Sequence, residues 1–254
     1  MSQVIPETVR CAVCGTRSEQ LVLISSNTFG SPDLDLRPPE MERSTMCYWV
    51  QQCPHCGYVA EHLEKIPKIT VPFLKTEEYK KCLGLTFSSK LAKQFFRQYL
   101  IQVVEKDAEK AFYAALHAAW ACDDAEDEEN AGLCRKYALV ELDKLLEKAD
   151  NETLVVQRAD LLRRAGLFNQ VIEEYENKYF SNDTLNRVIF FQVDRSYAQD
   201  TACYTVEDAL ENNIQYPNLL DKTKGSLHSL SDFIKQKIKK DDEVETEDWD
   251  AVDE

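Results

Sequence analysis

Two short cysteine motifs near the N-terminus constrain the fold of this chain more than any other feature. The first, "CAVCG", spans residues 11–15 and the second, "CPHCG", spans residues 53–57. In each motif a glycine, which adopts positive φ without strain, follows the second cysteine, so both thiolates can converge from one tight turn. A complete tetrahedral ligand set for one metal ion is therefore available from Cys11, Cys14, Cys53 and Cys56.

The alternative interpretation is that each CxxC pair acts alone as a redox motif at the start of a helix. The glycine shared by both motifs, and Pro54 in the second, favour metal-binding turns. Four thiolates fill the coordination shell, whereas a catalytic zinc keeps one position open for water. We therefore expect a structural zinc ion. Iron is possible too, because four cysteines accept either metal.

Composition and charge narrow the class of protein. The 254 residues include 30 Lys and Arg against 45 Asp and Glu, a net charge of −15, and nine carboxylates lie in the last fourteen residues. Nucleic-acid binding needs clustered cations, so we expect none. No apolar run is long enough for a membrane span, and the start lacks a secretory pattern. Nine cysteines, an odd number, indicate free thiols and a cytoplasmic location.

A long loop is expected between two predicted strands, residues 21–26 and 46–52. It spans residues 27–45 and contains one glycine and three prolines. It also carries the segment "DLDLRPP". In an extended chain Asp33 and Asp35 would face one way, with Arg37 beside them. Three interpretations stay open. The charged groups pair with one another and with turn amides, the loop docks a protein or ligand, or the two carboxylates hold a divalent ion.

The same motifs carry a family resemblance. "FGSPDLDLRPPEM" followed by "CPHCGYVAE", with "CAVCG" upstream, resembles the bacterial family catalogued as domain of unknown function 2225. The resemblance is close over residues 8–65 and looser beyond them. It implies a cysteine-liganded metal module on an intracellular bacterial protein, followed by tetratricopeptide-like helices. It implies no activity.

Helical spacing of apolar residues dominates after Pro72. We expect helices over 91–104, 108–122 and 131–148, two more within 153–180, and others over 184–199, 205–213 and 226–240. The segment "GLFNQVIEEY", residues 166–175, resembles the turn and second helix of a tetratricopeptide repeat. His117 lies off the apolar stripe of its helix and is expected to be exposed.

These observations predict an α+β chain in three parts. A zinc-ribbon β module spans residues 1–74, a mainly α-helical, tetratricopeptide-like bundle or short solenoid spans 75–240, and an acidic disordered tail spans 241–254. We expect an intracellular adaptor that binds a protein partner, in an oligomeric state the sequence does not fix. The first alternative is an enzyme or small-ligand binder that uses the loop, and the second is a nucleic-acid binder. The candidate loop residues are Asp33, Asp35, Arg37 and Trp49.

Overall fold

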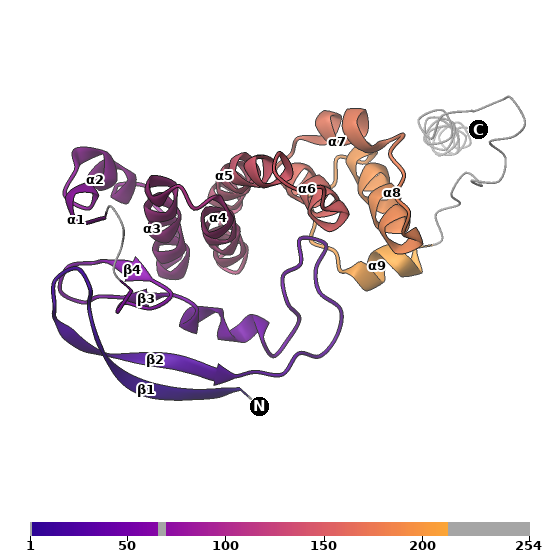
Figure 1. Cartoon of the computed structure of the whole chain (residues 1–254). Helices are drawn as coiled ribbons and strands as arrows, with labels where there is room; N and C mark the ends of the chain where they lie inside the picture. The colour runs from indigo at the N-terminus through magenta and orange to yellow at the C-terminus, as the bar shows by residue number, and fades with distance from the viewer. Residues whose placement is uncertain (1, 66–69, 213–254) are drawn as a thin grey trace, which may run out of the picture.

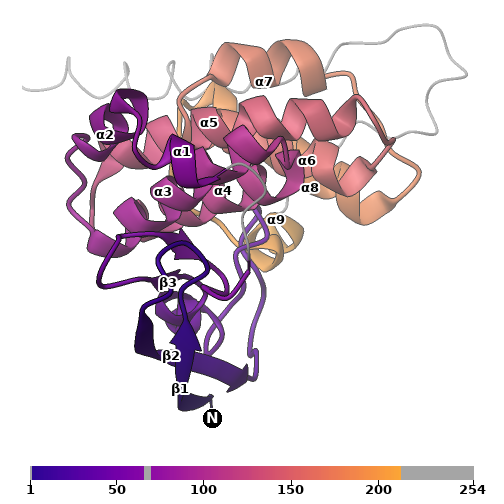
Figure 2. The ribbon, with the colours of Figure 1, turned by 60° about the vertical axis from the view of Figure 1, so that its left-hand side comes forward.

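The N-terminal part of the protein is built from two antiparallel hairpins. A computed structural model describes residues 2–65 and 70–212 (Figure 1). Strand β1 (Gln3–Arg10) pairs with β2 (Arg17–Ser25) in the long hairpin, and β3 (Gln51–Gln52) pairs with β4 (Val59–Ala60) in the short hairpin. A short 3-10 helix, η1 (Arg43–Tyr48), precedes β3. Figure 2 shows the long hairpin extending away from the layer of helices.

The rest of the described chain is helical, which confirms the α+β class. Consecutive helices pack against each other from α3 to α9 (Figure 1). No helix among the described residues has the length and apolar character that crossing a membrane requires. In chain order the helices are α1 (Thr70–Phe73), α2 (Glu77–Leu83), α3 (Lys90–Glu105), α4 (Ala108–Asp123), α5 (Glu128–Leu146), α6 (Glu152–Arg164), α7 (Phe168–Tyr175), α8 (Asp183–Tyr197) and α9 (Val206–Glu211).

Short polar side chains fix where most of these helices begin. An oxygen of each such residue accepts a hydrogen bond from a backbone N–H of the first helical turn, which satisfies a donor that has no partner inside the helix. For α3, α4, α5, α6 and α8 these residues are Ser89, Asp107, Asp127, Asn151 and Asn182. Thr205 and Asp208 complete a capping box at α9, as their spacing predicts.

Helix α4 forms the centre of the core. It packs between α3 and α5, and ten of its sixteen residues are buried. Its alanines let the neighbouring backbones approach closely, while Phe112 and Trp120 fill the space between helices. The predicted helices over 91–104 and 108–122 are confirmed to within two residues at each end.

Three expectations about local structure are wrong. Residues 46–52 form the end of η1 and only two strand residues, because Thr45 Oγ1 donates to the carbonyl of Glu42 and accepts from Trp49 Nε1, which favours a tight turn. Helix α5 starts at Glu128 rather than at Ala131, because Asp127 caps it. The strand β1 was not predicted.

The third wrong expectation concerns His117, which was predicted to be exposed. Its side chain is half-buried. Its ring lies about as close to Trp49 as to Phe95, with centroid distances of 5.1 and 5.2 Å. The predicted helix over 226–240 and the acidic tail over 241–254 lie outside the described residues. The three-part division of the chain and the tetratricopeptide-like repeats remain predictions.

Two glycines of the helical region, Gly132 and Gly166, should respond in opposite ways to substitution by alanine. Gly166 has φ +75° and ends α6, whereas Gly132 lies inside α5, and a Cβ at either would meet nothing within 4 Å. Gly166→Ala should lower the free energy of unfolding by about 1 kcal/mol, because L-residues are strained at positive φ. Gly132→Ala should raise it by about 0.5–1 kcal/mol. Urea unfolding of the two full-length variants measures both, and changes of the same sign would contradict this account.

Candidate metal centre

Both cysteine motifs form the turns of hairpins. The first connects β1 to β2, and the second connects β3 to β4. In each turn the N–H of the first cysteine donates to a carbonyl five residues later: Cys11 to Thr16 at 2.9 Å, and Cys53 to Tyr58 at 2.8 Å. The two turns therefore close with the same backbone geometry, although 38 residues separate Cys14 from Cys53.

The glycines complete each turn. Gly15 has φ +73° and Gly57 has φ +74°, and the N–H of each donates to the carbonyl of the first cysteine of its own turn. A left-handed residue is needed at this point to bring the chain back after the second cysteine. This explains in physical terms why a glycine follows both CxxC pairs.

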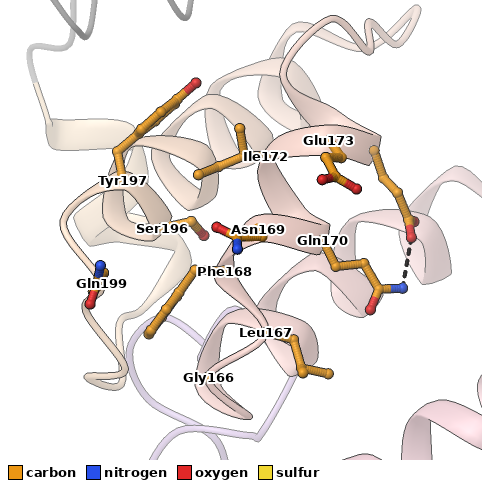
Figure 3. A pocket seen from close by; sticks show the side chains of 11 residues that line it. Gly166, Leu167, Phe168, Asn169, Gln170, Ile172, Glu173, Ser196, Tyr197 and Gln199 are labelled. Atoms are coloured by element: carbon orange, nitrogen blue, oxygen red, sulfur yellow. Dashed lines mark hydrogen bonds between the residues drawn. The ribbon is translucent and has the colours of Figure 1, made fainter.

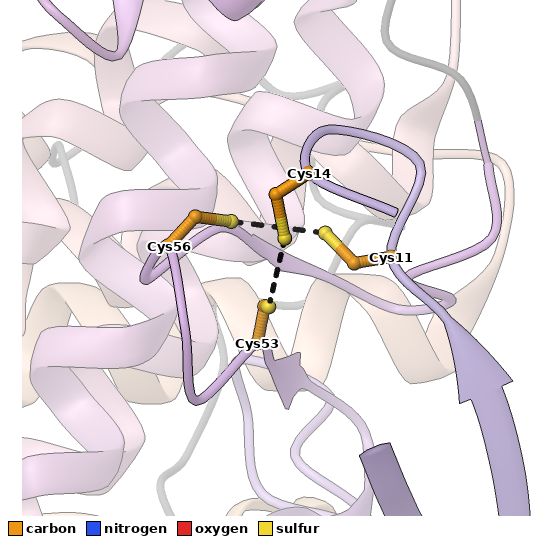
Figure 4. A group of neighbouring side chains, drawn as sticks. All are labelled: Cys11, Cys14, Cys53 and Cys56. Carbon is orange, nitrogen blue, oxygen red and sulfur yellow. Dashed lines mark hydrogen bonds between the residues drawn. The ribbon is translucent and has the colours of Figure 1, made fainter. Parts of the chain in front are cut away.

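The four sulfur atoms converge from the two turns (Figure 4). Cys11 Sγ lies 3.7 Å from Cys56 Sγ, Cys14 Sγ lies 3.6 Å from Cys53 Sγ, and all four lie within 4.8 Å of one another. A tetrahedral zinc with Zn–S bonds of about 2.3 Å has sulfur–sulfur distances of about 3.8 Å. The cysteine cluster therefore has the size that a metal ion requires.

One side of the cysteine cluster is buried in the protein, and a backbone hydrogen bond joins its two turn segments. Cys11 and Cys53 are 1% and 0% exposed, while Cys14 and Cys56 lie on the exposed side. The N–H of Ala12 donates to the carbonyl of the fully buried Leu63 at 2.8 Å, which ties the first turn to the segment after the second. The two turns are therefore fixed to each other by backbone contacts as well as by their sulfur atoms.

The thiols differ in how readily they ionise. Hydrogen bonds with Thr16 lower the pKa of Cys14 to about 5, whereas burial raises the pKa of Cys11 and of Cys56. A metal binds thiolates, so loading the cluster must release protons from the thiols whose pKa is raised, Cys11 and Cys56. Metal affinity should accordingly fall as the solution becomes more acidic.

The loop carboxylates lie elsewhere, inside the helical body. Figure 1 shows the loop over residues 26–42 rising from the end of β2 toward α6 and α9. Its backbone pairs with the segment before α9: the N–H of Leu34 donates to the carbonyl of Tyr204, and the N–H of Val206 donates to the carbonyl of Pro32. The loop is therefore docked against the helices.

Asp35 is the most enclosed group in this loop, with 0% of its surface exposed. Its Oδ2 accepts from Trp120 Nε1 at 2.7 Å and from Arg164 Nη1 at 3.0 Å, and its Oδ1 accepts from the N–H of Arg37 at 3.2 Å. Burial raises the pKa of Asp35, and the positive charge of Arg164 opposes that shift. Asp35 therefore connects the loop to α4 through a buried hydrogen bond and to α6 through a buried ion pair.

The extended chain in which Asp33 and Asp35 would face the same way does not occur here. The chain turns at this point, with the N–H of Leu36 bonded to the carbonyl of Asp33 and φ +66° at Leu36. Asp33 pairs with Arg43 at 2.5 Å and accepts from Cys203 Sγ at 3.2 Å.

Arg37 also has a partner of its own, Asp124, at 2.6 Å. Both oxygens of each loop aspartate, Asp33 and Asp35, are thus occupied by protein groups. The three charged side chains thus pair with Arg43, Arg164 and Asp124 rather than with one another, and the role of the loop stays a prediction. Among the described residues, the cysteine cluster is the one group of three or more potential ligands that lies close enough together to hold a metal.

An open groove of about 1000 Å³ lies between α7 and the end of α8 (Figure 3). Its lining includes the apolar side chains of Leu167, Phe168 and Ile172, the ring of Tyr197 from α8, and the acidic Glu173. This groove contains the turn that resembles a tetratricopeptide repeat. The residue pattern indicates the turn, whereas the open groove beside it depends on how α7 packs against α8.

Comparison with known proteins gives one match. A family model described as "Uncharacterized protein conserved in bacteria (DUF2225)" matches residues 4–216. No curated protein and no solved structure matches the chain significantly. The family match confirms the resemblance seen in the two cysteine motifs and in the loop between them.

Replacing one buried ligand should release the metal. Cys53→Ser should weaken metal binding at least about 100-fold, because even groups that only support a ligand contribute 10- to 100-fold. Cys47→Ser is the matched control, since Cys47 is exposed and outside the cluster. Elemental analysis of both purified full-length variants measures the metal content. Equal metal content in the two would contradict the assignment.

Removing the charge of Asp35 should destabilise the protein. Asp35→Asn leaves Arg164 buried with one partner fewer and should lower the free energy of unfolding by about 2–3 kcal/mol. Glu77→Gln is the control: the side chains of Glu77 and its partner Lys80 are 79% and 56% exposed, and loss of this pair should cost at most about 1 kcal/mol. Urea unfolding compares the two variants, and equal losses would show that the buried pair has no special role.

Proposed function

The chain belongs to the family described as uncharacterized protein conserved in bacteria (DUF2225), and we propose that it is an adaptor of the bacterial cytoplasm. In this proposal zinc, or iron in its place, occupies the cysteine cluster and stabilises the fold. The metal-anchored hairpin and the helical body each present a surface to a partner protein. The four sulfur ligands leave no coordination position for a substrate, which favours a structural role for the metal.

The observation that carries this proposal is the set of large apolar side chains on the surface of the long hairpin and the loop after it. Leu21, Ile24 and Phe29 are 50%, 53% and 63% exposed, and Ile5 and Met41 are exposed as well. Soluble proteins rarely expose extended apolar patches except where they bind another molecule, and we propose that these five side chains contribute to one such surface. The outer edges of a two-stranded sheet also offer backbone groups for pairing with a partner strand.

The groove between α7 and α8 supplies the second surface that an adaptor needs. It combines apolar side chains with the acidic Glu173, so it suits a partner segment that has both apolar and basic residues. Helical arrays commonly bind peptides in grooves of this kind. The two surfaces lie at opposite ends of the described chain, in β1–β2 and in α7–α8 (Figure 1).

The alternatives have less support. An enzyme that uses the loop would need free groups, and Asp33, Asp35 and Arg37 are 3%, 0% and 5% exposed and engaged in ion pairs. A nucleic-acid binder would need a cationic surface, and the chain carries a net charge of −15.

The hairpin can be tested by charge substitution in the full chain. Ile24→Lys combined with Phe29→Lys should reduce recovery of co-purifying proteins at least about tenfold, because lysine cannot fill an apolar interface. Thr8→Lys combined with Ser25→Lys adds the same charge at exposed polar positions of the hairpin and should leave recovery unchanged. The tagged chains are expressed at native level in the bacterium that encodes them, and bound proteins are quantified by mass spectrometry.

Two results would contradict the proposal. One is that the native chain enriches no protein above the tag alone. The other is that both double variants retain the same proteins at the same level.

A further inference from the structure

The groove between α7 and α8 combines apolar, acidic and uncharged polar side chains (Figure 3). Leu167, Phe168 and Ile172 are half-buried, so each keeps apolar surface that a further segment could cover. Glu173 and Glu174 add two negative charges, and no Lys or Arg from the described part of the chain lines the groove. A segment that fits this lining must therefore carry apolar side chains together with positive charge.

Glu173 is the acidic group of the groove whose charge is still unpaired. Glu174 pairs with Arg158 at 2.5 Å and accepts from Gln170 Nε2 at 2.7 Å. Glu173 is exposed, and it takes part in no ion pair among the described residues. One exposed ion pair contributes at most about 1 kcal/mol. Apolar contacts must therefore supply most of the affinity, while the negative charge selects a basic segment.

The chain contains a segment of this chemistry, "SLHSLSDFIKQKIKK", at residues 226–240, beyond the described residues. Four of its last six residues are lysines. In the helix that its sequence predicts, five large apolar side chains share one face: Leu227, Leu230, Phe233, Ile234 and Ile238. Amphipathic helices commonly bind by laying such a face into a groove, with anchors at positions i, i+3 and i+7.

The segment is attached near enough to reach the groove. The described chain ends at Asn212, just after α9, and Arg187 Nη2 donates to the carbonyl of Leu210, which places the end of α9 beside the first half of α8. From Arg187 to Tyr197, which lines the groove, α8 rises about 15 Å. The intervening residues 213–225 could span up to roughly 40 Å of extended chain.

Tethering makes even a weak contact significant. A segment joined through a short linker has an effective concentration of about 1 mM at a site within its reach. A contact with a Kd of about 1 mM, or about 4 kcal/mol, would therefore occupy the groove about half of the time. A free partner would need a comparable concentration to do the same.

We propose that residues 226–240 dock as a helix in the α7–α8 groove of their own chain, with the apolar face against Phe168 and Ile172 and the lysines toward Glu173. A partner protein that uses this groove must then displace the segment. That competition rests on the proposed adaptor role, whereas the docking itself does not.

Photocrosslinking in the full chain tests the docking directly. Phe233→p-benzoylphenylalanine places a photoreactive ring on the apolar face without adding charge. Peptide mapping by mass spectrometry should find the main crosslinks in residues 166–174 and 196–199. An equal mixture of isotopically light and heavy chains should give crosslinks within each kind of chain, because the groove and the segment belong to one molecule.

Substitutions in the crosslinking chain separate the apolar contribution from the charge. Ile234→Asp combined with Ile238→Asp should lower the crosslink yield at the groove at least about tenfold, because carboxylates cannot fill an apolar contact. Glu173→Lys should lower it at least about threefold, since a cation would then face the lysines across an exposed contact. Glu7→Lys makes the same charge reversal at an exposed residue of β1 and should leave the yield unchanged.

Four results would overturn the proposal. The crosslinks are spread over the surface without preference for the groove, so the segment has no fixed site. The main crosslinks fall on the acidic residues 241–254 or on the long hairpin. The crosslinks join light chains to heavy chains, so the groove binds a second copy. Glu173→Lys and Glu7→Lys lower the yield equally, so the effect is one of overall charge.

Discussion

The convergence of four sulfur atoms from two distant turns is the constraint on which the N-terminal half depends. A two-stranded hairpin is at best marginally stable in water, and here both hairpins have only two strands. A metal in the cluster would join the turn of the long hairpin to that of the short one, in a region with few strand residues to form a core. Binding worth on the order of 10–16 kcal/mol in small zinc modules can replace such a core.

The loop over residues 26–42 provides a second anchor, at the other end of the long hairpin. Asp35 is held by Trp120 and Arg164, while the backbone of Leu34 pairs with Tyr204. The cluster thus fixes the turn of the hairpin, and the loop fixes its open end to the helical body. Between these two points β2 contacts η1 on one side, while Leu21 and Ile24 stay exposed on the ordered strand.

Local chemistry made much of this structure predictable. The glycine after each CxxC pair, the spacing of Thr205 and Asp208, and the apolar stripe of α3 are signals that lie within a few residues of one another. The partners of Asp35 could not be predicted, because Trp120 and Arg164 lie 85 and 129 residues away. The half-buried position of His117 was missed for the same reason, since Trp49 covers it from a different element. Strand propensity also gave a wrong prediction for most of residues 46–52. Hydrogen bonds of Thr45 favour a 3-10 helix at the start of this segment.

The most direct test of this account is X-ray absorption at the metal edge of the purified full-length protein. We predict one metal ion per chain, surrounded by four sulfur atoms at about 2.3 Å. Nitrogen or oxygen atoms in the first coordination shell, fewer than four sulfurs, or a protein that purifies without tightly bound metal would contradict the central claim.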